Sequence, residues 1–290
     1  MVLLDKPVGI SSNRALQKVR GIYQAIKAGH TGSLDPFATG MLPVCLGEAS
    51  KTAAFMLEAA KKYRATAVLG VATTTGDIEG EVIQTSTPPD LDSEDLSLVL
   101  KKFIGEIQQV PPMYSALKYE GKPLYEYARA GIEIDRPARA VTIHQIELIS
   151  WQALRLTFDV CCSKGTYIRT LAEDIAGKIG SYAHLVELRR IAVEPFDAYP
   201  MHTLEQLQEA RDHDELNRFL LPIDVGLTKW PRIVLSADQQ GKFRHGNNFP
   251  FAAHKVEPGN VRVYGTEEDL LGLGALSTDG VLQPIRVFNL

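Results

Sequence analysis

Residues 29–40 read GHTGSLDPFATG and are followed directly by the apolar stretch MLPVCL. An Asp-Pro pair alone usually marks the start of a turn, because the Asp side chain hydrogen-bonds to nearby backbone and Pro fixes φ. Here, glycines at positions 29, 32 and 40 permit backbone conformations that other residues resist. Polar side chains such as His30 also lie close in sequence to the single carboxylate, Asp35. The segment therefore predicts a loop built to present Asp35.

The elements around this loop predict an α+β fold. A short strand is expected at residues 2–5, and Ser11 or Ser12 can cap a helix whose apolar residues recur at helical spacing from Leu16 to Ile26. Further helices are expected at residues 51–60, 96–105, 123–131, 166–179 and 203–220. Strand-like alternation is found at residues 61–73, 82–85, 140–150 and 154–162. Because pairs of strands are adjacent in sequence, we expect a mixed, largely antiparallel sheet with flanking helices.

The pattern changes from about Trp230 onward. Short alternating strands at residues 261–265, 270–276 and 281–288 are separated by Gly, Asp and Pro turns. They predict a small, all-β, barrel-like module. No Ser/Gly-rich tether precedes it, so we expect the module to dock on the larger part of the chain. The predicted domains are residues 1–229 and 230–290.

Composition indicates an ordinary globular chain of 290 residues, 45% hydrophobic and 23% charged. The first residues do not resemble a signal peptide, and no window approaches the roughly eighteen apolar residues of a membrane span. A cytoplasmic protein is therefore expected. The three cysteines form no C-x-x-C pair and the histidines do not cluster, so neither a metal site nor a disulfide framework is indicated.

Charge is distributed unevenly along the chain. The net charge of −4 hides a basic excess in residues 1–72, which hold nine Lys or Arg against four acids, and in residues 101–190, which hold thirteen against ten. Residues 73–100 hold seven acids and no Lys or Arg. A basic face can thus exist beside acidic surroundings, and the local field is what a polyanion meets. The distribution is compatible with a nucleic-acid partner.

Three other interpretations of motifs in the sequence are disfavoured. The segment around Asp35 lacks the lysine that a Walker loop places after its last glycine. Ser115 and Lys118 match the S-x-x-K of serine acylases, but the partner motifs of those enzymes are missing. Asp77 and Glu79 resemble a glycosidase carboxylate pair, but their turn, rich in Gly and Thr, favours a solvated loop.

A possible partner for Asp35 lies far along the chain. Residues 161–175, CCSKGTYIRTLAEDI, begin a helix and place Arg169 on its first turns. An arginine beside an aspartate lowers the pKa of that carboxyl by roughly 1 to 3 units, which keeps it ionised at neutral pH. Arg169 is therefore a candidate to orient the Asp35 carboxylate and keep it ionised, although the sequence alone does not show that the two side chains are in contact.

Residues 108–135 are expected to form an RNA-binding arm. Aromatic and cationic side chains alternate there, as in surfaces that stack bases and contact phosphates. The residues are Met113, Tyr114, Lys118, Tyr119, Lys122, Tyr125, Tyr127 and Arg129. For Tyr125 and Tyr127, packing into a core is an equally open interpretation.

Six blocks carry a resemblance to a known family. They are LDKPVGISS at residues 4–12, GHTGSLDPFATGMLPVCLGEASK at 29–51, KKYRATAVLG at 61–70, QQVPPMYSALKYEGKPLYEYARAG at 108–131, CSKGTYIRTLAEDI at 162–175 and HLVELRR at 184–190. In content and order, the chain resembles the bacterial tRNA pseudouridine-55 synthases, the TruB family. The C-terminal part resembles the small RNA-binding PUA domain of that family.

The resemblance implies the pseudouridine synthase fold and an isomerase that converts uridine 55 in the TΨC loop of tRNA to pseudouridine. Asp35 matches the catalytic aspartate, Arg169 the arginine that pairs with it, and Tyr63 the tyrosine that stacks on the target base and is implicated in proton removal. Leu188 matches a leucine packed near the base, and His30 a histidine that enters the T-loop when nucleotides flip out. No cofactor, metal, membrane or obligate protein partner is implied, and a monomer is expected. The alternative is a noncatalytic tRNA-binding or tRNA-folding protein on the same scaffold.

Overall fold

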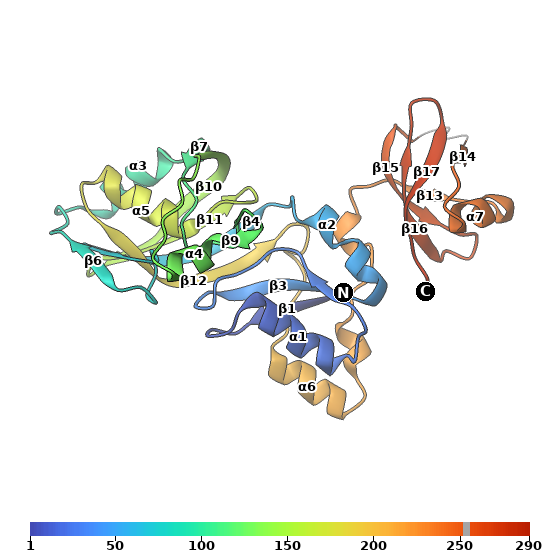
Figure 1. The fold of residues 1–290 in the computed structure, drawn as a ribbon, viewed down its shortest axis with the longest axis horizontal. Helices are drawn as coiled ribbons and strands as arrows, with labels where there is room; N and C mark the ends of the chain where they lie inside the picture. Colours follow the sequence, from blue (N-terminus) through green and yellow to red (C-terminus); the bar gives the residue numbers. More distant parts are fainter. Residues whose placement is uncertain (252–255) are drawn as a thin grey trace.

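The computed structural model describes residues 1–251 and 256–290. Two separate β-sheets organise these residues, as Figure 1 shows: a large sheet flanked by helices, and a smaller one near the C-terminus. No helix in the described residues is both long and apolar enough to cross a membrane.

Within the described residues, the larger sheet has eight strands in the order β1-β3-β12-β4-β11-β10-β7, with β2 paired to β3. Their bounds are β1 (Val2–Lys6), β2 (Ala28–His30), β3 (Thr39–Leu46), β4 (Lys61–Leu69), β7 (Gly105–Gln109), β10 (Arg139–Gln152), β11 (Arg155–Cys162) and β12 (Ala183–Val193). All neighbours are antiparallel except β3 and β12, which run parallel over a short register. The predicted α+β fold with a mixed, largely antiparallel sheet is therefore confirmed.

The core lies between this sheet and its helices. Apolar side chains of β4, β11 and β12 pack against α3 and α5 in one buried cluster. The helices are α1 (Ser12–Ile22), α2 (Ala53–Met56), α3 (Ser93–Lys101), α4 (Leu124–Arg129), α5 (Ile168–Lys178), α6 (Leu204–Asp212) and α7 (Ala237–Arg244). Two hairpins, β5 (Val71–Thr73) with β6 (Val82–Thr85) and β8 (Lys118–Tyr119) with β9 (Lys122–Pro123), lie outside both sheets.

Several predicted helices end earlier than expected: α1 ends at Ile22, before Ile26, and α3 ends at Lys101, before Gly105. Two further segments differ more. A 3-10 turn, Gly47–Lys51, ends where the segment 51–60 begins, and the segment itself contains only the four-residue helix α2. Its remaining carbonyls at Leu57 and Ala59 accept hydrogen bonds from the Lys61 ammonium, at 2.7 and 2.6 Å, which ends the helix. The segment 203–220 ends as an α-helix at Asp212, because Asp214 has a φ of 60° that a right-handed helix excludes.

The smaller sheet comprises β13 (Arg232–Val234), β14 (Phe249–Pro250), β15 (Gly259–Tyr264), β16 (Leu270–Leu276) and β17 (Val281–Val287). Its half-barrel shape fits a PUA-like domain. The expectation of an all-β module is wrong, because α7 lies beside the strands and is capped by Ser236 and Gln239. Leu273 and Phe288 share an apolar cluster with Met1, so the small sheet packs on the rest of the chain.

Candidate active site

The loop that carries Asp35 joins β2 to β3 and is fastened from both sides. The Ser12 hydroxyl accepts a hydrogen bond from the Leu34 amide at 2.7 Å and lies 3.0 Å from the Leu34 carbonyl. On the other side of Asp35, the fully buried Lys6 ammonium donates to the Pro36 carbonyl at 3.3 Å. The backbone that presents the carboxylate is thus fixed to α1 and β1.

A buried arginine from the central strand β12 also holds this loop. Arg190 is 1% exposed, and its guanidinium donates to the carbonyls of Met41, Ser33 and Gly32 at 2.7, 3.3 and 3.1 Å. Gly40 has a φ of +101°, and a Cβ there would lie 2.3 Å from the Arg190 carbonyl oxygen. Only glycine therefore lets β3 and β12 approach closely enough for these contacts.

Arg169, at the start of α5, connects Asp35 to two other parts of the chain. Its Nε lies 3.0 Å from Asp35 Oδ2, and its Nη1 lies 3.4 Å from Asp77 Oδ2. Nη1 and Nη2 also donate to the carbonyls of Thr75 and Tyr114, at 2.7 and 2.8 Å. With its side chain 5% exposed, Arg169 is held in one position by four groups.

Asp35 faces a cavity of about 350 Å³. Residues from the loop, β4, β12, the arm and the start of α5 line it, among them Asp35, Tyr63, Ser115, Tyr167, Arg169 and Leu188. The Asp35 side chain is 38% exposed, so the carboxylate can be reached from the cavity although protein surrounds it closely. The volume and the mixed apolar and polar lining are typical of a small-ligand site.

The environment of Asp35 makes its carboxylate more basic than an ordinary one. Burial raises its pKa above the ordinary value, the positive charge of Arg169 opposes that rise, and the negative charge of Asp77 adds to it. Arg169 thus lowers the pKa of Asp35 as predicted, but burial outweighs the ion pair and the net shift is upward. A carboxylate that remains ionised despite a raised pKa is a better base and nucleophile.

Tyr63 on β4 and Leu188 on β12 form an apolar wall of the cavity. They are 9% and 7% exposed, and both line the space that Asp35 faces. Burial raises the pKa of the Tyr63 phenol, and the nearby Arg190 charge opposes that rise. Because Tyr63 contributes an aromatic ring to this wall, the wall can stack against a planar ring that enters the cavity.

Comparison with known proteins identifies the family. The N-terminal domain of TruB family pseudouridylate synthases matches residues 20–168, and two TruB C-terminal domains match residues 169–228 and 231–288. The chain belongs to the TruB family. Two relatives, both called tRNA pseudouridine synthase B, come from Chromobacterium violaceum and Nitrosococcus oceani. They are 50% and 48% identical over 99% of this chain and 94% of each relative.

A solved structure agrees with this TruB assignment. A chain in the crystal structure of a Cbf5-Nop10-Gar1 complex matches with a TM-score of 0.76 and 25% identity, over 99% of this chain and 84% of that chain. The family resemblance read from the six sequence blocks is therefore confirmed, as is the pseudouridine synthase fold.

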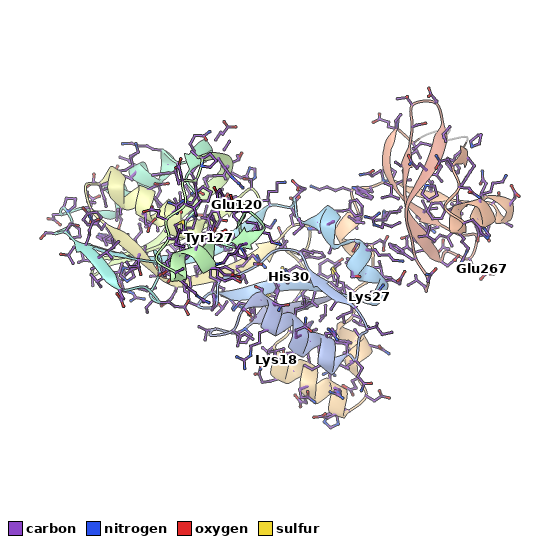
Figure 2. All side chains as sticks on the ribbon, viewed as in Figure 1. Lys18, Lys27, His30, Glu120, Tyr127 and Glu267 are labelled. Carbon is purple, nitrogen blue, oxygen red and sulfur yellow. The ribbon has the colours of Figure 1, made fainter. Side chains whose placement is uncertain are left out.

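Other predicted site residues, namely His30 and the arm cations, do not line the cavity. His30 ends β2, where its Nδ1 accepts from the Gly32 amide at 3.4 Å, and burial lowers its pKa. Figure 2 shows His30 on the blue strand, with Glu120 and Tyr127 on the green arm. The predicted arm cations are exposed, namely Lys118, Lys122 and Arg129.

The arm supplies its own aromatic contacts. Lys122 and Arg129 lie over the rings of Tyr127 and Tyr125, at 4.8 and 5.4 Å, and Tyr119 meets Tyr127 edge to face. Tyr125 and Tyr127 are half-buried and Tyr119 is exposed, and none of the three belongs to the main core. Tyr114 is half-buried and contributes its carbonyl to Arg169.

Sequence reasoning missed two charged residues of this TruB site. Asp77 was expected in a solvated loop, but it is 3% exposed and pairs with Arg169, while Glu79 is exposed as expected. Arg190 lies in the block HLVELRR but was given no role. The spacing of Arg189 and Arg190 on a strand, which sends one side chain to each face, was the available signal.

Proposed function

We propose that the protein isomerises a uridine of tRNA to pseudouridine, and that the target is uridine 55 in the T stem-loop. The curated relatives are named as tRNA pseudouridine synthases, and this chain aligns with them over nearly its whole length. The observation that carries the proposal is Asp35, a carboxylate held by Arg169 at 3.0 Å and open to a cavity large enough for a single ring.

The chemistry matches this arrangement. The bond between N1 of uracil and C1′ of ribose breaks, the uracil rotates, a bond forms between C5 and C1′, and the C5 proton is lost while N1 gains one. The conversion leaves the oxidation level unchanged, so we propose that no redox cofactor is involved. Asp35 acts as the catalytic carboxylate, and a two-step route through such a group lowers the barrier of a difficult displacement.

Arg169 and Tyr63 assist Asp35 in this scheme. Arg169 fixes the direction of the carboxylate, since its guanidinium is itself held by Asp77 and two carbonyls. Tyr63 stacks on the extruded uracil and is a candidate for proton removal, with Leu188 packed beside the base. A stacked base is out of reach, and extrusion costs a few kcal/mol, which contacts in the cavity offset. His30 fills the space that the flipped nucleotides leave.

RNA binding is assigned to two regions. In the arm, residues 108–135, Tyr114 stacks on RNA while Lys118, Lys122 and Arg129 meet phosphates. Residues 230–290 form the PUA-like domain and add contacts to the rest of the tRNA, whereas residues 1–229 hold the catalytic centre. We propose a monomer that acts in the cytoplasm without an obligate protein partner.

The test is a comparison of Asp35→Asn with the unaltered protein on unmodified tRNA transcript. We expect the single-turnover rate of pseudouridine formation to fall by at least about 1,000-fold, with tRNA affinity changed less than about threefold, because the lost group acts on the reacting atoms. The control is Asp159→Asn, which removes the same charge from an aspartate paired with Arg64 at 2.8 Å outside the cavity. Equal, nonzero yields from Asp35→Asn and the unaltered protein would show that Asp35 is not the catalytic carboxylate. No pseudouridine from the unaltered protein would favour the noncatalytic tRNA-binding or tRNA-folding alternative.

A further inference from the structure

Ser115 is a cavity residue whose hydroxyl has no assigned role. It lies in the arm between β7 and β8, is 5% exposed, and lines the cavity that Asp35 faces. Among the described residues, its Oγ is a fully buried polar atom that makes no hydrogen bond. A buried hydroxyl without a partner is unfavourable, so its place in a cavity wall indicates a partner supplied from the cavity.

The backbone of Ser115 is fixed, although its side chain is unpaired. Its amide donates to the Met113 carbonyl at 2.9 Å, and its carbonyl accepts from the Tyr125 amide at 3.1 Å. The preceding carbonyl, of Tyr114, accepts from Arg169 at 2.8 Å. The guanidinium that contacts Asp35 thus also holds the backbone beside Ser115, which fixes the Ser115 side chain relative to the Asp35 carboxylate.

The Tyr167 phenol lies beside the Ser115 side chain, and Tyr167 also lines the cavity. Burial raises the pKa of Tyr167, and a weak hydrogen-bonding interaction with the Ser115 side chain opposes that rise. The geometry of this interaction falls short of an ordinary hydrogen bond, which leaves Ser115 Oγ without a partner in the described structure. The Ser115 hydroxyl is thus a buried donor without an ordinary partner, in the wall of the cavity that Asp35 faces.

We propose that Ser115 Oγ donates a hydrogen bond to a carbonyl oxygen of the target uracil and positions the ring during its rotation. The inference rests on the proposed isomerisation. Rotation by half a turn about the line through N3 and C6 puts C5 where N1 was and exchanges O2 with O4. A fixed hydroxyl donor therefore faces a carbonyl oxygen both before and after the rotation, and its own proton can turn to suit either.

The test measures single-turnover rates, tRNA affinity and melting temperature for Ser115→Ala. We expect the rate to fall about 10- to 100-fold while tRNA affinity stays within about twofold, because phosphate contacts dominate affinity. The melting temperature should not fall, since no hydrogen bond within the protein is lost. The matched control is Thr31→Val, which removes another buried, unpaired hydroxyl that does not line the cavity. It should leave the rate unchanged.

Thiolated substrates provide a second test, because a thiocarbonyl accepts hydrogen bonds weakly. The target uridine is replaced by 2-thiouridine or by 4-thiouridine, and the resulting loss of rate is measured for each protein. For at least one of the two substrates, this loss should be at least about fivefold greater in the unaltered protein than in Ser115→Ala. Equal sensitivity of both proteins, an unchanged Ser115→Ala rate, or a melting temperature lowered by several degrees would overturn the inference. If the unaltered protein makes no pseudouridine, the proposed function itself is wrong; if only the Ser115 results fail, that function stands.

Discussion

The cations of the cavity and those of the arm are held in opposite ways. Arg169 is 5% exposed and is fixed by two carboxylates and two backbone carbonyls. The arm cations are exposed, and the contacts of Lys122 and Arg129 are with neighbours in the arm itself. A group that orients a reacting carboxylate must be fixed beforehand, whereas groups that follow an RNA backbone must adapt to it.

This contrast separates two kinds of defect. Changes at the fixed cation should lower the rate constant and the stability of the fold, and salt should matter little because the charges are buried. Changes at the adaptable cations should weaken tRNA binding in a salt-dependent way and leave the chemical step intact. Each prediction below tests one side of the contrast.

Among changes to the cations, the largest effect is expected from Arg169→Gln. The substitution leaves the buried Asp77 without its cationic partner and frees Asp35 to move. Breaking a buried pair in this way costs about 3 to 5 kcal/mol of unfolding free energy. Single-turnover rates should fall at least about 100-fold at every salt concentration, since removal of a positioning group misaligns the reacting atoms.

The control for this prediction is Arg155→Gln. Arg155 also pairs with a carboxylate, that of Glu187 at 3.0 Å, but the two side chains are 49% and 69% exposed. Exposed pairs contribute only about 0 to 1 kcal/mol, so both stability and rate should remain close to those of the unaltered protein. Comparable losses in the two variants, measured by denaturant unfolding, would remove the distinction between buried and exposed arginines.

A smaller effect is expected from reversing two arm charges, in Lys122→Glu/Arg129→Glu. At about 50 mM salt the dissociation constant for tRNA should rise at least about tenfold, and at about 300 mM by no more than about threefold, because salt screens exposed charges. The rate at saturating tRNA should stay within about threefold. Filter binding over a salt series measures this directly.

Lys101→Glu/Lys102→Glu provides the matched control, because both lysines are exposed at the end of α3 and the change in net charge is the same. If this variant loses as much affinity as the arm variant, the effect belongs to overall charge. Equal losses at low and high salt would contradict the electrostatic role of the arm.

The sequence predicted features that depend on local pattern. Helix α1 begins after the predicted cap Ser11, and the hairpin of β10 and β11 follows the predicted alternation. The central strand β12 was not predicted, since register shifts after Leu185 and Arg190 interrupt its alternation of buried and exposed side chains. A regular period can be recognised from the sequence alone, whereas the conformation of a bulged strand is set by the strands that pair with it.

Site residues divide in the same way. Asp35 stood out because its own loop is unusual, although Gly29 does not take the positive φ that Gly32 and Gly40 have. Asp77 lies in a turn of solvated composition and becomes buried through a bridge to Leu185 and the contact with Arg169. Such burial is a tertiary effect, and no local signal marks it.

Lys164 shares properties with both the fixed and the adaptable cations. The smallest effect is predicted for a change at its partner, Glu58. Its side chain is 57% exposed and lines the cavity, but its ammonium lies 2.5 Å from the carboxylate of Glu58. RNA phosphates must compete with that carboxylate for the same ammonium. Glu58→Gln should therefore lower the dissociation constant for tRNA by about two- to threefold at low salt, as expected for an exposed pair, with the rate unchanged.

Glu187→Gln controls for the loss of one negative charge, because Glu187 forms a similarly exposed pair with Arg155, at 3.0 Å, and does not line the cavity. If it strengthens binding as much as Glu58→Gln does, Lys164 is not a phosphate contact and only net charge has changed. If Glu58→Gln alone strengthens binding, and the gain disappears in Glu58→Gln/Lys164→Gln, then Lys164 is an adaptable cation at the rim of a fixed site. Adaptable cations would then be found at the mouth of the cavity as well as in the arm.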